Sequence, residues 1–366
     1  MPDDLNRRTF LGTASAFAAG AALAPRIALA QDEALTVALV VPSPVGDVGW
    51  SRALADGLEP IRAAHGDKVN IQILENIAEG PDADRIMNKV VADGCKFLVA
   101  GSFGYQNGAL QIARRNPDVS VLHASGFMVA PNFTPFAARY FEGSYLMGMA
   151  AAALSKTGKL GSVSAFAIPE LITTINAFAL GAQAVNPAAE VSVVWVNSWF
   201  DPAGEQEAAK ALLASGCDAV FSNAQDTPSV VSVCEDAGAY VFNLNSSMQK
   251  YAPTKYLGCV RTDWSPFFTA SFDAHLNGTF KGYNAFLGMA DKVVELVDVS
   301  PDIPPEIKAK MDEVQTAIMA GSFSPYAGPI LKQDGTEGVP AGTTMEDAAI
   351  VAMDWHVKGV TTPLPK

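Results

Sequence analysis

The chain of 366 residues has little positive charge and few cysteines. It carries 25 lysine and arginine residues against 38 aspartate and glutamate residues, for a formal net charge of −13. Such an acidic chain repels the phosphates of nucleic acids and anionic lipids, so we expect no nucleic-acid partner. The 4 cysteines cannot make a disulfide scaffold for a chain of this length. We therefore expect them to be free or buried thiols.

Signals of catalysis are also scarce. The 4 histidines do not follow the spacing of metal ligands. The sequence contains no G-x-S-x-G elbow, no phosphate loop and no G-x-G-x-x-G motif. We therefore expect a protein that is not an enzyme and that has no metal site and no cofactor.

Long apolar runs are missing too, and the longest candidate lies near the N-terminus. Asn6-Arg7-Arg8-Thr9-Phe10-Leu11 is typical of a twin-arginine export signal. The apolar stretch from 11 to 24 is too short to span a bilayer, and Ala28-Leu29-Ala30 is an A-x-A cleavage site. We predict a signal peptide over 1–30, cleaved after Ala30, and a periplasmic product with no direct membrane insertion.

Beyond residue 33, short β-rich apolar runs alternate with amphipathic segments, which predicts βαβ units around a parallel sheet. The pattern recurs about 120 residues later. Gly94 and Cys95 before one strand are echoed by Gly216 and Cys217 before another. Likewise, Asn76 shortly before a proline is echoed by Asn197. The repeat indicates two similar lobes.

The expected fold class is therefore α/β, with two Rossmann-like parallel-sheet lobes joined by a hinge and a ligand in the cleft between them. We assign 34–140 plus about 258–283 to the N-terminal lobe, and 141–257 plus about 284–330 to the C-terminal lobe. The tail, 331–366, is expected to pack on the lobes. We expect a monomer.

In open parallel sheets, ligands bind outside the carboxyl ends of the strands. The loops expected there combine aromatic rings with amides, hydroxyls and a few carboxylates, which suits a flat heterocycle. The candidate ligand-binding residues are Asp47, Trp50, Ser51, Phe103, Gly104, Tyr105, Trp199, Phe200, Asp226, Asn245, Ser247 and Asp263. Trp50 and Trp199 fall on opposite lobes and could close on a ligand from both sides, or each could pack a lobe core. Asp47 and Asp201 could instead cap helices, and for Asp201 capping is the preferred interpretation.

Several segments resemble one family. Asp47-Val48-Gly49-Trp50-Ser51 is similar to its first-loop D-x-x-F-N pattern, and Asn197-Ser198-Trp199-Phe200-Asp201-Pro202 is similar to the N-[ST]-W-F-D-P stretch of a purine-binding subgroup. Residues 140–148 and 353–360 match further motifs in order. The sequence thus resembles the basic membrane protein family of ABC-transporter receptors, which includes purine nucleoside receptors with a type I periplasmic binding protein fold.

The resemblance implies that Asp47 binds the purine edge and that Trp50 and Trp199 stack on the ring. It places Asp226 near the cleft. Asn245 and Ser247 stand where nucleoside receptors hold a ribose-binding aspartate, and the family's ribose-binding lysine is missing around 261–263.

These departures favour a purine nucleobase, or a related purine or nucleoside, bound by hinge closure and passed to an ABC-transporter permease. One alternative is a receptor for a sugar or another small polar solute. A second alternative, from a different class, is a nucleoside-processing hydrolase.

Overall fold

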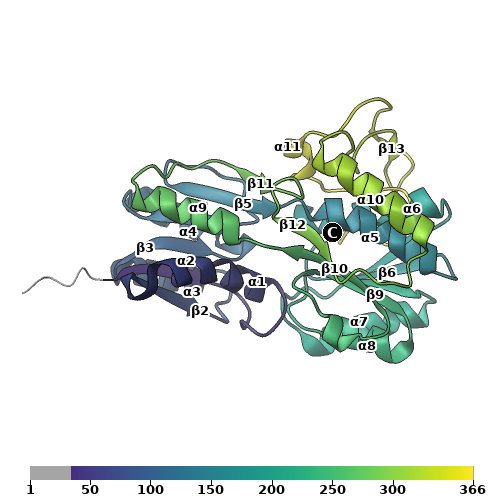
Figure 1. Ribbon diagram of the computed structural model, residues 1–366, viewed down its shortest axis with the longest axis horizontal. Coiled ribbons are helices and arrows are strands. Elements are labelled where there is room, and N and C mark those ends of the chain that lie inside the picture. The colour runs from purple at the N-terminus through teal and green to yellow at the C-terminus, as the bar shows by residue number, and fades with distance from the viewer. Residues whose placement is uncertain (1–33, 366) are drawn as a thin grey trace, which may run out of the picture. The chain divides into compact units, whose positions relative to one another are not determined.

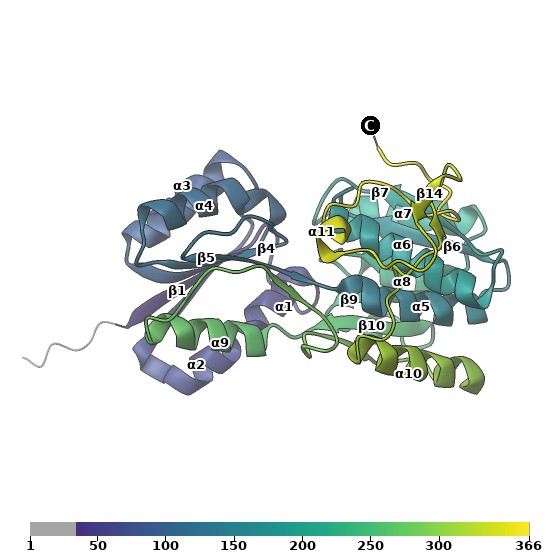
Figure 2. The same cartoon turned by 90° about the horizontal axis from the view of Figure 1, so that it is seen from above.

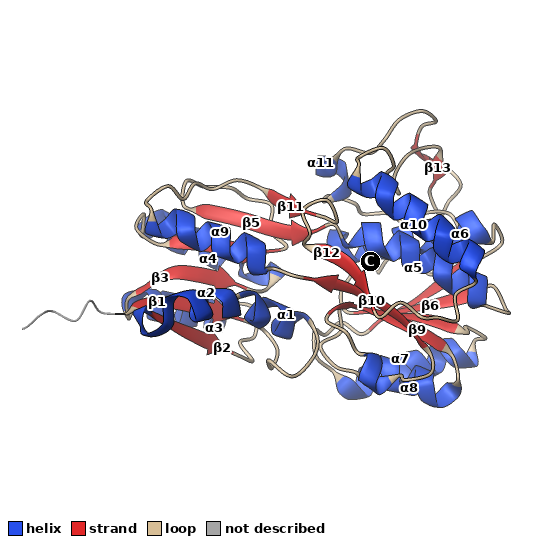
Figure 3. Cartoon of the chain, viewed as in Figure 1, coloured by secondary structure: helices blue, strands red, loops and turns tan. Residues whose placement is uncertain are grey.

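Alternating strands and helices build two six-stranded sheets (Figures 1 and 3). The structure, a computed structural model, describes residues 34–365. The predicted signal peptide over 1–30 lies outside the described residues.

The first sheet has the strand order β11-β5-β4-β3-β1-β2, and all neighbouring strands are parallel. Its strands are β1 (Leu35–Val40), β2 (Val69–Leu74), β3 (Cys95–Ala100), β4 (Ser120–Ala124), β5 (Phe133–Ala138) and β11 (Ala285–Leu287). Its helices are α1 (Trp50–Gly57), α2 (Glu59–His65), α3 (Pro81–Ala92), α4 (Gln106–Arg115) and α9 (Ser265–Leu276). Helices α3 and α4 cover one face, and α2 and α9 cover the other (Figure 2).

The second sheet has the order β12-β10-β9-β8-β6-β7, and only its edge strand β12 is antiparallel. Its strands are β6 (Lys159–Ser164), β7 (Glu190–Trp195), β8 (Ala219–Asn223), β9 (Tyr240–Asn245), β10 (Tyr256–Thr262) and β12 (Val294–Val297). Its helices are α5 (Tyr140–Leu154), α6 (Pro169–Val185), α7 (Pro202–Ala214), α8 (Ser229–Ala237) and α10 (Pro305–Met319). The predicted fold class, with two largely parallel α/β lobes, is confirmed.

The internal repeat is visible in the backbone as well as in the strand order. Asn76 and Asn197 follow equivalent strands and both lie in the left-handed region, at φ 58° and 56°. Asparagine tolerates this region better than most residues. Gly94 and Gly216 also have positive φ at equivalent helix ends. The two lobes therefore share local turns in addition to topology.

The chain passes between the lobes three times, from β5 to α5, from β10 to α9, and from β11 to β12. The second and third passages fall later than the expected positions near 258 and 284. The reason is that β10 continues the parallel ladder of the second sheet beside β9, whereas β11 pairs with β5 in the first sheet. Only α9, β11 and the segment between them return to the first lobe.

Aromatic side chains secure that return. Trp264, at the start of α9, is fully buried, and its ring centroid lies 4.8 Å from that of Phe136 in β5. Phe268, one turn later, stacks beside Trp264. This cluster closes the first lobe with residues that follow most of the second lobe in the chain.

The four cysteines Cys95, Cys217, Cys234 and Cys259 are free and buried, as predicted.

The tail continues through the hairpin strands β13 (Ile330–Leu331) and β14 (Glu337–Val339) and the short helix α11 (Asp347–Ile350). It then packs on the second lobe, where the Thr361 amide donates to the Val191 carbonyl oxygen at 2.8 Å. Among residues 34–365, no helix has the length and apolar character needed to cross a bilayer.

Candidate ligand-binding site

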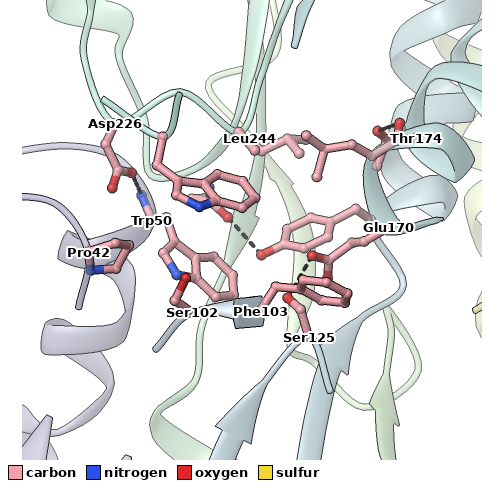
Figure 4. A pocket seen from close by; sticks show the side chains of 14 residues that line it. Pro42, Trp50, Ser102, Phe103, Ser125, Glu170, Thr174, Asp226 and Leu244 are labelled. Carbon is pink, nitrogen blue, oxygen red and sulfur yellow. Dashed lines mark hydrogen bonds between the residues drawn. The ribbon is translucent and has the colours of Figure 1, made fainter. Parts of the chain in front are cut away.

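A narrow pocket lies where the carboxyl ends of strands from both sheets approach each other (Figure 4). The free volume between its side chains is about 30 Å³. Its lining residues are Pro42, Trp50, Ser102, Phe103, Ser125, Tyr140, Glu170, Leu171, Thr174, Trp199, Ala224, Asp226, Leu244 and Asn245. The lining combines aromatic rings with polar groups and contains two carboxyls but no lysine or arginine.

The two predicted tryptophans both line the pocket, one from each lobe. Trp50 opens α1, packs edge-on against Trp264, and donates from Nε1 to the Gly101 carbonyl oxygen at 2.8 Å. Trp199 follows β7, lies 4.7 Å from the Phe166 ring centroid, and donates from Nε1 to Glu79 Oε1 at 3.3 Å. Each indole is only partly buried and is held by a hydrogen bond at its nitrogen. Both rings are therefore held in place by protein contacts in this arrangement of the lobes.

Asp226 joins the lobes at the first turn of α1. That helix begins after Gly49, which has no side chain to cap it, and the first turn of the helix contains no acidic residue. Asp226, from the other lobe, accepts hydrogen bonds from the Trp50 amide and from the hydroxyls of Ser43 and Ser51. A carboxylate at a helix N-terminus satisfies free amides and complements the helix dipole. Asp226 thus caps a helix that its own lobe does not contain.

Burial and hydrogen bonding act in opposite directions on this carboxyl. Burial raises the pKa of Asp226 to about 6, while the bonds from Ser43, Trp50 and Ser51 lower it. A Cβ atom on Gly49 would lie 2.5 Å from Asp226 Oδ1, and the φ of Gly49 is 96°. The Gly49 amide also donates to Ser246 Oγ at 2.6 Å. Glycine is therefore required at this interlobe contact, for its backbone conformation and for the close approach.

Two further hydrogen bonds cross between the lobes around the pocket. Ser125 Oγ donates to Glu170 Oε2 at 2.7 Å, and Trp199 donates to Glu79 as described above. Within the second lobe, the Tyr140 hydroxyl at the start of α5 donates to Asn245 Oδ1 at 2.7 Å. The lobes are therefore held in a closed arrangement by polar contacts that surround the pocket.

Five of the twelve predicted ligand-binding residues line the pocket. They are Trp50, Phe103, Trp199, Asp226 and Asn245. Asp47 is not among them. It lies in an exposed ion pair with Lys250 and also accepts from the Tyr251 hydroxyl, and its contact with a ligand stays a prediction. The hydrogen bond from Lys250 lowers the pKa of Asp47. Asp47 is therefore bound to protein groups away from the pocket lining, and it does not cap a helix.

The other six predicted residues lie near the pocket without lining it. Ser51 is fully buried beneath Asp226, and the Tyr105 hydroxyl donates to the Ile77 carbonyl oxygen inside the first lobe. The Gly104 amide donates to Glu79, and Phe200 is 42% exposed. Asp263 accepts from the Ser265 amide at the start of α9. Ser247 accepts from the Gln249 amide, whereas its neighbour Ser246 makes the contact between the lobes.

The expected helix cap at Asp201 is confirmed, since its carboxylate accepts from the Gly204 amide at 3.0 Å at the start of α7.

The sequence analysis did not predict three residues of the pocket lining, Glu170, Ser125 and Tyr140. Glu170 and Ser125 follow β6 and β4, so the rule used for the other loops would have found them had those two loops been included. Tyr140 lies where the chain first crosses between the lobes, and no local pattern identifies it as part of the pocket lining.

A second cavity adjoins the pocket at Phe103, Ser125 and Glu170. It is wider, with a free volume of about 500 Å³, and part of its wall comes from residues 348–352 of the tail. Phe127, which is 59% exposed, lies at this cavity. The narrow pocket therefore opens on a larger space on the side of Glu170.

Two matching α/β lobes with a pocket between their strand ends define a solute-binding protein of the two-lobed kind. The sequence of residues 34–326 matches the family model described as ABC transporter substrate-binding protein, PnrA-like. The chain belongs to this family, as the sequence resemblance indicated.

Relatives agree with this assignment. The chain is 37% identical to a purine-binding protein of Brucella abortus over 335 residues, which is 92% of this chain and 95% of the relative. It is 30% identical to a putative ABC transporter glucose-binding protein of Haloferax volcanii, over 84% of this chain and 78% of the relative. A solved solute-binding protein of an ABC transporter system from Aeropyrum pernix has the same fold. It has a TM-score of 0.70 at 16% identity and covers 79% of this chain and 92% of that structure.

The contact between Asp226 and α1 yields a prediction about closure. Asp226→Ala removes the acceptor for three donors, and a hydrogen bond to a charged group contributes about 1.5–3 kcal/mol. We expect the ligand-free variant to shift toward an open form with a larger radius of gyration in small-angle X-ray scattering. Asp47→Ala, which removes an exposed interlobe ion pair worth about 0–1 kcal/mol, is the matched control. Identical scattering of both variants and the wild type would contradict a closing role for Asp226.

Proposed function

We propose that the protein is the periplasmic receptor of an ABC importer that binds a purine nucleobase, or a closely related purine, by closure of its two lobes. It delivers this ligand to a membrane permease and performs no chemistry on it. The observation that carries the proposal is the pair of oriented indoles, Trp50 and Trp199, contributed by opposite lobes to one narrow pocket.

The character of the pocket supports a flat and uncharged ligand. Aromatic walls favour a planar ring, because stacking on an aromatic face contributes about 1–3 kcal/mol per base. Two carboxyls and the absence of lysine and arginine from the lining disfavour phosphate or carboxylate groups. The relative from Brucella abortus, which is named as purine-binding, supports the same class of ligand.

Closure supplies the link between binding and transport. A ligand that contacts both lobes stabilises the closed form through its higher affinity for that form, and a permease can then distinguish loaded from empty receptor. The three interlobe passages provide the hinge, and the contacts of Asp226 and Glu170 join the lobes in the closed arrangement. The narrow free volume means that the lobes must part before a ring can enter.

A ligand panel tests this function. Adenine, hypoxanthine, adenosine, adenosine 5′-monophosphate and glucose are titrated by calorimetry and by thermal shift. A ligand at 100 times its Kd stabilises the fold by about 2.7 kcal/mol. We expect a free base to bind at least as tightly as its nucleoside, and the monophosphate not to bind.

Two other outcomes of the panel would overturn the proposal. Binding of glucose without binding of any base would favour the sugar receptor, which the relative from Haloferax volcanii suggests. Detection by chromatography of a new product formed from adenosine would favour the hydrolase.

The paired indoles predict the effect of single substitutions. Trp50→Ala or Trp199→Ala should each weaken binding of the base by roughly 5- to 150-fold, since about 1.4 kcal/mol corresponds to tenfold. Replacement by phenylalanine should retain most of the affinity, because a flat ring remains. Calorimetry measures the Kd, and thermal unfolding without ligand serves as the control. Normal binding with a much lower melting temperature would mean that the tryptophans stabilise the lobes and do not contact the ligand.

The predicted signal peptide carries the proposal of periplasmic location by the twin-arginine route. A reporter fused to residues 1–30 should be exported, and the double change Arg7→Lys and Arg8→Lys should block its export, because this route depends on the arginine pair. Cell fractionation measures the exported share. Export that survives the double change would instead indicate the general secretory route.

A further inference from the structure

The wall of the pocket that faces Trp50 and Asp226 carries a carboxyl with one oxygen left free (Figure 4). Glu170 lies in the first turn of α6, and its Oε2 accepts from Ser125 Oγ at 2.7 Å. The residue as a whole is partly accessible, but its Oε1 is buried and has no hydrogen-bond partner among the described residues. A buried polar atom without a partner is costly, which makes this oxygen a site for a ligand atom.

The neighbouring polar side chains already have partners. The Tyr140 hydroxyl donates to Asn245, and Asp226 accepts from three groups of the first lobe. The Thr174 hydroxyl donates to the Leu171 carbonyl oxygen at 2.7 Å. Among the described side chains of the lining, Glu170 Oε1 is the one buried polar atom without a hydrogen bond.

The surroundings of Glu170 favour its neutral form. Burial raises the pKa of Glu170 to about 7, although the bond from Ser125 lowers it. The ionisable groups that share the pocket, Asp226 and Tyr140, bring no positive charge, and burial holds the pKa of Tyr140 well above its usual range. Because Ser125 donates to Oε2, the proton of the neutral carboxyl belongs on Oε1. The group then offers an O–H donor beside a carbonyl acceptor.

We propose that Glu170 recognises the edge of the bound ring as a neutral carboxyl. It donates from Oε1 to a ring nitrogen and accepts, at Oε2, an N–H of the adjacent amino group. The ligand class is therefore a heterocycle in which an acceptor nitrogen lies beside an N–H donor, as in adenine. This proposal rests on the proposed function and assigns the residue that determines specificity in the same pocket.

The test compares three forms of residue 170 with adenine as the probe. Calorimetry gives the Kd between pH 6 and pH 8.5. In the wild type, affinity should fall by up to about tenfold per pH unit above about pH 7, because the ionised carboxyl must regain a proton to bind. Glu170→Gln keeps a donor beside an acceptor at every pH, so its Kd should stay within about threefold of the wild type at pH 6 and lose most of the pH dependence. Glu170→Leu offers neither group and should bind at least tenfold more weakly.

Glu205→Gln is the matched control. Burial also raises the pKa of Glu205 to about 7, but this residue is bonded to Thr227 and does not line the pocket. Its pH profile should follow the wild type, including any contribution from Asp226. Circular dichroism and thermal unfolding establish that each variant is folded.

The outcomes separate this proposal from the function on which it rests. Weak binding by Glu170→Gln at every pH, together with wild-type affinity that does not fall with pH, would mean that an ionised carboxylate binds two donors. If all three forms bind adenine with the affinity of the wild type, Glu170 does not contact the ligand and has a structural role alone. Either result overturns the proposal while leaving a purine receptor in place. Failure of the wild type to bind any base would overturn both.

Discussion

The closed arrangement of this protein depends on a helix that cannot cap itself. Helix α1 starts after a glycine, and its free amides are satisfied by Asp226 from the opposite lobe. The carboxylate, two serine hydroxyls and the glycine backbone occupy a space too tight for any larger residue at position 49. Because Trp50 is the first residue of the same helix, the contact that joins the lobes also fixes one wall of the pocket. The contact between the lobes and the position of this pocket wall therefore depend on the same turn of backbone.

The duplicated topology explains why the pocket is built from so many separate loops. Both sheets use the same strand order, so their carboxyl ends present equivalent turns toward the space between the lobes. Asn76 and Asn197 mark one such pair of turns, and their matching left-handed conformations show how closely the repeat is preserved. The two lobes nevertheless place different types of side chain at these equivalent turns. Trp50 and Phe103 come from the first lobe, whereas Glu170, Trp199 and Asp226 come from the second.

Sequence patterns predicted the lobes well because strand and helix periodicity is local and recurs. They predicted Trp50 and Trp199 for the same reason, since each follows a strand of one repeat. They did not reveal the ion pair of Asp47, because nothing local indicates that Lys250, which is distant in the chain, pairs with it. They also misplaced the return to the first lobe, because β10 and β11 are both short apolar runs and only pairing distinguishes their sheets. The carboxyl of Glu170 is bonded to Ser125, which lies in the other lobe, and this pairing could not be deduced from either segment alone.

The late return of the chain has a consequence for the order of synthesis. The parallel strands β1 to β5 leave the ribosome before any of the second lobe, but the side chain of Phe136 lacks its neighbours Trp264 and Phe268 until the start of α9 follows. The edge strand β11 comes later still, and β12 then returns to the second sheet. The first lobe therefore cannot complete its core until α9 and β11 have been synthesised, after most of the second lobe. The first lobe therefore keeps an incomplete apolar core for longer than its early strands alone would suggest.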